Sequence, residues 1–70
     1  MIDKSIVGKG LDRTVYLYDE ERHIELYTTG GFDSFIINNY YQADDLLIND
    51  EQLLVLADMI AEMKKEMGIR

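Results

Sequence analysis

The segment from Asn49 to Met67 constrains this chain most, because it has the pattern of one helix with unusually extensive apolar surface. Asn49 and Gln52 have the spacing of a capping box, and Gly68 follows the last apolar residue as a C-cap. Acidic residues occupy the first turn and lysines the last, as the helix macrodipole favours. We therefore predict a helix over residues 49–67.

The apolar residues of this helix cover more than one face. They sweep about 220° at about 100° per residue, with Leu54 and Met59 at the edges and only Lys64 as an interruption. A helix on one sheet face needs a stripe of little more than about 100°. The excess indicates either self-association or a curved sheet that wraps more of the helix. The residues assigned to self-association are Leu53, Leu54, Leu56, Met59, Ile60, Met63 and Met67.

Alternating, β-branched and aromatic runs predict strands upstream of the helix. These runs are residues 14–18, 23–28 and 34–41. Leu46–Ile48 is a candidate for a short fourth strand, and Ile6 and Val7 are compatible with the start of another. Short connections favour antiparallel neighbours. We expect one domain over residues 1–70, an α+β fold in which a small antiparallel meander of three or four strands packs against one C-terminal helix in the order β-β-β-(β)-α.

The alternation also separates two faces of the predicted sheet. The aliphatic residues Val15, Leu17, Ile24 and Leu26 are expected under the helix. The third strand offers two alternating sets, and we favour the one with Phe35 and Ile37 on the inner face over the one with Ile36 and Tyr40. The open face then carries the candidate partner-binding residues Tyr16, Tyr18, Glu25, Tyr27 and Tyr40, together with His23. Tyrosine is enriched in protein interfaces because it offers large contact area at low entropy cost. The alternative is that cross-strand tyrosine pairs simply stabilise the sheet.

Composition narrows the function classes. Seven basic and fourteen acidic residues give a formal net charge of −7, which opposes binding to phosphate backbones and suits a basic protein surface. The absence of cysteine excludes disulfides and Cys-based zinc sites, and no motif indicates a metal, a cofactor or a catalytic residue. His23, the only histidine, is expected as a solvent-exposed strand residue. No signal-peptide h-region and no apolar run of about 20 residues are present, so we expect a cytoplasmic location without membrane contact.

Two resemblances add to these observations. The stretch L-L-I-N-D-E-Q-L-L-V-L resembles the end of single-stranded-DNA-binding modules of the PC4 type, in which a sheet also runs into a helix. In size, acidity and β-then-α layout, the chain is similar to small phage-encoded inhibitors of host machinery, including anti-CRISPR and other anti-defence proteins. The second resemblance implies an inhibitor that acts in a host cytoplasm.

The sequence thus favours a non-enzymatic interaction protein. We expect a homodimer or higher homo-oligomer that binds and inhibits or regulates another protein, whose surface is basic. The alternatives are a small single-stranded nucleic-acid-binding module and a structural or assembly subunit of a larger complex.

Overall fold

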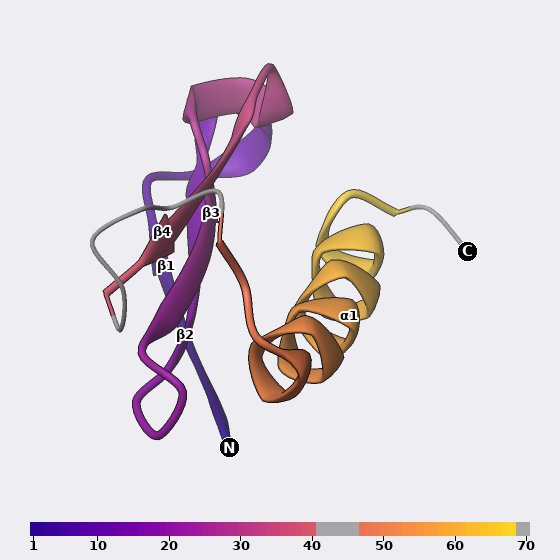
Figure 1. Cartoon of the computed structure of the whole chain (residues 1–70). Coiled ribbons are helices and arrows are strands. Elements are labelled where there is room, and N and C mark those ends of the chain that lie inside the picture. Colours follow the sequence, from indigo (N-terminus) through magenta and orange to yellow (C-terminus); the bar gives the residue numbers. More distant parts are fainter. Residues whose placement is uncertain (41–46, 69–70) are drawn as a thin grey trace.

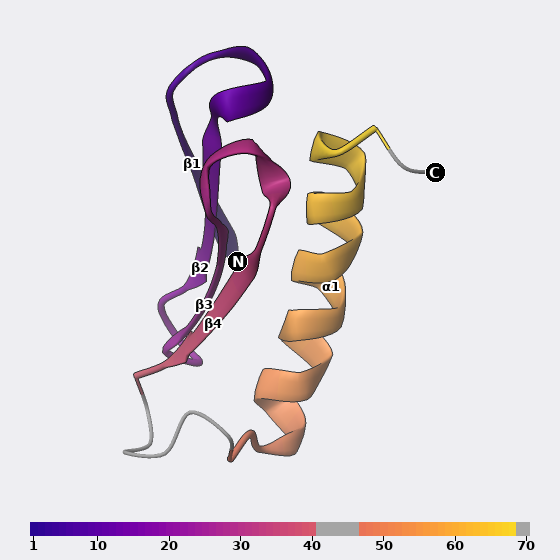
Figure 2. The same ribbon diagram turned by 90° about the horizontal axis from the view of Figure 1, so that it is seen from above.

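The computed structural model describes residues 1–40 and 47–68. Its elements are β1 (Ile2–Val7), β2 (Thr14–Asp19), β3 (Ile24–Thr28), β4 (Phe35–Asn39) and α1 (Asp50–Glu66). The strands form one antiparallel sheet in the order β1-β2-β3-β4, and α1 lies across one face of it (Figure 1). A view from above separates these two layers (Figure 2). The predicted α+β meander closed by a C-terminal helix is confirmed, with four strands.

The fourth strand precedes the three predicted ones instead of following them. β1 pairs with β2 from Ile2, opposite Asp19, to Val7, opposite Thr14. Every β1 side chain after Ile2 is exposed, because this edge strand lies beside the helix rather than beneath it. An edge strand has little need for apolar alternation, which explains its weak signal in the sequence. Residues 47 and 48 of the other candidate strand are irregular, and residue 46 lies outside the described residues, as does residue 41 of the third predicted strand.

The core lies between the helix and the two central strands. It consists of Val15, Leu17, Ile24, Leu26, Val55, Leu56, Met59 and Met63. The four strand residues are those that alternation assigned to the inner face, and each contributes about 1.5–3 kcal/mol on full burial. On β4, Ile37 packs against this core, whereas Phe35 is 45 % exposed at the edge of the sheet.

The helix buries a stripe of about 100°, the width expected for one sheet face. Its buried members are Gln52, Val55, Leu56, Met59 and Met63. Met59 is completely buried near the middle of this stripe, so the prediction that it lies at an edge is wrong. The prediction took Leu53 as the reference, but the helix is turned so that Leu53, Leu54 and Ile60 face outward.

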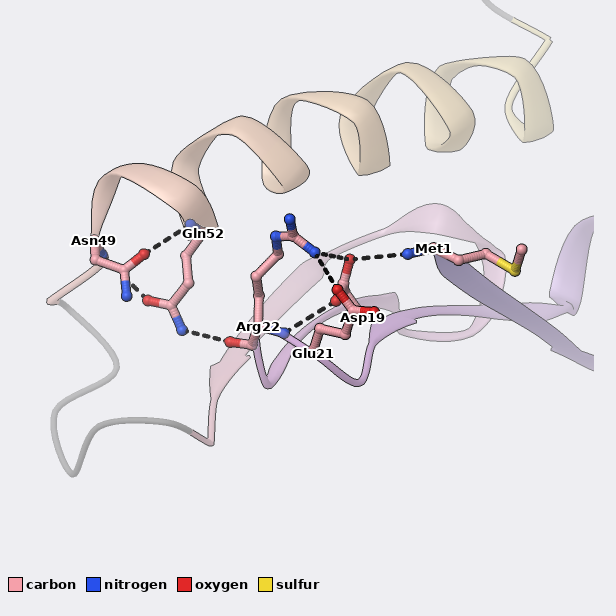
Figure 3. Close-up of polar contacts among 6 residues, drawn as sticks. All are labelled: Met1, Asp19, Glu21, Arg22, Asn49 and Gln52. Carbon is pink, nitrogen blue, oxygen red and sulfur yellow. Dashed lines mark hydrogen bonds and ion pairs between the residues drawn. The ribbon is translucent and has the colours of Figure 1, made fainter.

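A buried polar network fixes the start of α1. Gln52 is fully buried, and its Nε2 donates to the carbonyl oxygen of Arg22 and to Oδ1 of Asn39, both at 2.8 Å (Figure 3 shows the contact with Arg22). Its Oε1 accepts from the backbone N–H of Asn49 at 3.2 Å, while Asn49 Oδ1 accepts from the backbone N–H of Gln52 at 2.8 Å. The reciprocal bonds between Asn49 and Gln52 are the predicted capping box. Gln52 also joins the helix to the turn before β3 and to the last residue of β4.

An ionic cluster fixes the end of α1. Arg13 donates to the carbonyl oxygen of Glu66 at 2.7 Å, and Lys4 Nζ lies 2.6 Å from Glu66 Oε1. The hydrogen bond from Lys4, with the charges of Lys4 and Arg13, lowers the pKa of Glu66 although partial burial opposes this. Met67 is the C-cap of α1, and Gly68, the predicted cap, follows it with a φ of 78°, the left-handed conformation in which helices commonly end.

Replacing Gln52 by Ala should remove the hydrogen bonds that join the start of α1 to the sheet. The carbonyl of Arg22 and the amide of Asn39 would each lose a buried partner, so we expect Gln52→Ala to lower the free energy of unfolding by about 2–4 kcal/mol. Urea denaturation measures this. The neighbouring exposed Glu51→Ala should change stability by only about 0.5 kcal/mol, and equal losses in the two variants would contradict the network's role.

Acidification should remove the stabilisation that Glu66 provides. Its folded pKa is below the unfolded value of 4.5, so the ionised carboxylate stabilises the fold above pH 4.5 and loses this effect as the pH falls through the folded pKa. We expect wild type to have a higher free energy of unfolding than Glu66→Gln at pH 7. This difference should become smaller toward about pH 3. Urea titrations at both pH values measure it, and an unchanged difference would refute the ion-pair account.

Candidate interaction surfaces

The sheet face opposite α1 carries four tyrosines, and no described helix or strand covers it (Figure 2). Tyr16 lies opposite Tyr27 with ring centroids 5.1 Å apart and nearly parallel, whereas Tyr18 meets Tyr40 edge-on at 6.2 Å. Tyr18 also lies opposite Glu25. All five predicted partner-binding residues therefore share one surface, which we call the tyrosine face. The ring pairs also stabilise the sheet by about 0.2–1 kcal/mol each.

One end of the tyrosine face forms an open hollow of about 250 Å³ lined by Tyr18, Glu25 and Tyr40. Glu25 Oε1 accepts from the Tyr40 hydroxyl and from Asn38 Nδ2, each at 3.2 Å. Partial desolvation and the Glu25 carboxylate raise the pKa of Tyr40. Asn38 was absent from the predicted set, because only the β3–β4 register places it opposite Glu25. The hollow therefore holds an oriented carboxylate beside two aromatic rings.

Positive charge is kept away from this face. Among the described strand residues whose side chains point to it, Asp3 and Glu25 are acidic and none is lysine or arginine. Lys4 and Arg13 pair with Glu66 at the helix, and Arg22 lies 3.7 Å from Asp19 on the helix side (Figure 3). The tyrosine face is consequently aromatic and anionic.

The outer side of α1 forms a second uncovered surface. Its residues are Asp50, Leu53, Leu54, Ala57, Ile60, Ala61 and Lys64, all exposed, and we call them the helix strip. Leu53 is 60 %, Leu54 71 % and Ile60 48 % exposed. These three belong to the predicted self-association set. The other members differ: Leu56, Met59 and Met63 lie in the core, and Met67 packs partly buried against it. The helix strip thus replaces the broader predicted arc as the surface available to another molecule.

A groove of about 850 Å³ separates β1 from the flank of α1. Its charged lining is largely paired internally, since Lys4 binds Glu62 and Glu66 while Lys65 binds Glu62. In the described part of the chain, no buried side-chain nitrogen or oxygen lacks a hydrogen-bond partner. The groove therefore offers a ligand no buried polar side chain that lacks a partner within the described residues.

His23 lies in the β2–β3 turn, one residue before β3 begins, and is exposed as predicted although not in a strand. Its φ of 53° lies in the left-handed region, which suits a tight turn. Within residues 1–40 and 47–68, no group of three His, Asp or Glu residues could hold a metal ion. No helix in these ranges is long and apolar enough to cross a bilayer.

No protein-family model, curated protein or solved structure matches this chain. We therefore infer the function from the tyrosine face and the helix strip.

Neutralising Glu25 should change the titration of Tyr40. Without the carboxylate beside it, the phenolate loses a repelling charge, so we expect Glu25→Gln to lower the pKa of Tyr40 toward its ordinary value. The measurement is the ultraviolet phenolate titration of wild type minus that of Tyr40→Phe, repeated in the Glu25→Gln background. An unshifted difference curve would show that Glu25 does not act on this hydroxyl.

Proposed function

We propose that this protein is a non-enzymatic interaction module that self-associates through α1 and binds a cationic surface of another protein through the tyrosine face. The observation that carries the proposal is the uncovered sheet face with four tyrosines, two carboxylates and no lysine or arginine among its described strand residues. Tyrosine-rich surfaces are typical of protein recognition.

The hollow between Tyr18 and Tyr40 supplies the chemistry for a lysine or arginine side chain. A cation over a tyrosine ring is attracted by the ring quadrupole, with about 0.5–1 kcal/mol at an exposed site. Glu25 adds a carboxylate that Asn38 and Tyr40 hold in place through Oε1, while Oε2 has no hydrogen-bond partner among the described residues. A guanidinium could therefore contact both a ring and a free carboxylate oxygen.

The formal charge of −7 supports the same kind of partner over a nucleic acid. Binding to phosphates draws its affinity from lysine and arginine, and here Lys4, Arg13 and Arg22 are engaged in ion pairs on the helix side. An acidic module that covers a cationic protein surface would exclude nucleic acid from that surface by direct competition. Inhibition or regulation of a nucleic-acid-handling protein follows from this mode of binding.

One observation favours the alternative of single-stranded nucleic-acid binding. Tyr16 and Tyr27 stack at 5.1 Å on an open sheet, and exposed aromatic rings on sheets can stack nucleobases. This mode requires cations along the strand path, so the two functions predict opposite results with a charged probe.

Affinity capture from the cells that encode the protein tests the proposal. Wild-type protein should retain a basic protein in stoichiometric amount. Tyr18→Ala should reduce its retention about two- to fivefold because it removes a cation–ring contact, and Glu25→Gln should reduce it about tenfold because it removes the carboxylate of the cation site. Leu11→Ala, at an exposed site in the β1–β2 connection, is the matched control and should retain it fully.

A titration with single-stranded DNA at several salt concentrations separates the alternative. The proposal expects no binding at any salt concentration, whereas binding that weakens steeply with salt would overturn it.

In the affinity capture, equal retention of the captured protein by wild type, Tyr18→Ala, Glu25→Gln and Leu11→Ala would also show that the tyrosine face is not the binding site.

A further inference from the structure

The helix strip has a self-complementary arrangement about its midpoint. Ala57 lies at the centre, and Asp50 and Lys64 each lie seven residues from it in opposite directions. Leu54 and Ile60 are likewise equidistant from Ala57. In an antiparallel pair of identical helices, a two-fold axis at Ala57 therefore brings Asp50 of each copy against Lys64 of the other.

We propose that the chain forms a homodimer in which the two α1 helices pack antiparallel, with Ala57 at the two-fold axis and reciprocal Asp50–Lys64 ion pairs at the ends. This deepens the self-association in the proposed function by naming the surface, the register and the orientation. It does not depend on the tyrosine face.

Sterics and packing favour this register. Ala57, one of the two alanines of the strip, sits at the crossing point, where helix axes approach to about 8–10 Å. Larger apolar side chains flank it, with Leu54 71 % and Ile60 48 % exposed in the single chain. Pairing brings Leu54 of one copy level with Ile60 of the other on the two flanks of the contact, so each copy covers part of the exposed apolar surface of its partner.

The charges also select a second copy as the occupant. Lys64 and Asp50 form no ion pair within the described part of the chain, although Lys4, Arg13, Arg22 and Lys65 all do. The strip carries one acid and one base, so it is neutral within a chain of formal charge −7. Two acidic copies therefore meet with least repulsion here. Antiparallel packing also sets the positive end of each helix dipole beside the negative end of the other.

The size of the strip sets the expected strength. Seven side chains from each copy are fewer than the roughly 20–30 residues per side of a standard stable interface. The dimer should accordingly dissociate with a Kd of about 1–100 µM, which makes association measurable by dilution.

Reversed charges test the register. Sedimentation equilibrium should give wild type twice the 8.1 kDa chain mass above the Kd. Asp50→Lys alone sets Lys against Lys64, and Lys64→Glu alone sets Glu against Asp50, so each should weaken the dimer about tenfold. An equimolar mixture of the two variants should recover wild-type affinity, because both ion pairs form again in the heterodimer. Glu20→Lys and Lys9→Glu, which make the same changes in net charge at exposed sites outside α1, should leave the Kd unchanged.

Leu54→Glu should yield a folded monomer, since it places a charge at an exposed site that the dimer would bury, whereas Leu11→Glu at a comparably exposed site should not. Circular dichroism verifies folding in each variant. Wild type that stays monomeric throughout would overturn both self-association and this register, leaving the cation-binding proposal intact. Wild type that dimerises, with no recovery in the mixture, would overturn the register alone.

Discussion

The arrangement of this molecule depends on the rotation of α1 about its own axis, and contacts at both helix ends set that rotation. At the start, the fully buried Gln52 bonds the backbone of Arg22 and the side chain of Asn39. At the end, Arg13 and Lys4 hold Glu66. Apolar packing is non-directional and would tolerate several rotations of a helix with so broad an apolar surface. Hydrogen bonds and ion pairs are directional, so they select one.

This rotation decides which apolar side chains remain outside. Met59 and Val55 enter the core, while Leu53, Leu54 and Ile60 stay exposed. It also lets Glu62 and Glu66 pair with Lys4 and Arg13 on the helix side. The opposite sheet face is thereby left aromatic and anionic. The same polar contacts therefore position the helix and determine the chemical character of both surfaces.

Local signals were sufficient to predict the helix limits, its caps and the two faces of the central strands, since these depend on neighbouring residues and on a period of two. The helix rotation was not predictable in this way. Arg13 and Glu66 are 53 residues apart, and nothing in either local pattern indicates that they meet. Most of strand β1 was not predicted, for a related reason. It is an edge strand whose side chains are mostly exposed, so burial imposes little apolar pattern on its sequence. Asn38 joined the candidate site only through the register of β4 against β3.

The tyrosine face and the helix strip lie on opposite sides of the molecule. Because α1 covers one face of the sheet, a dimer formed through the helix strips would place both sheets on the outside, with their tyrosine faces pointing away from each other (Figure 2). Such a dimer would be bivalent. A partner that carries two cationic sites, or two partners in one complex, could then be held with an avidity about 10²–10⁴ times the affinity of a single face. Weak dimerisation would be an advantage under these conditions, because occupancy of both faces by a linked target would itself favour the paired form.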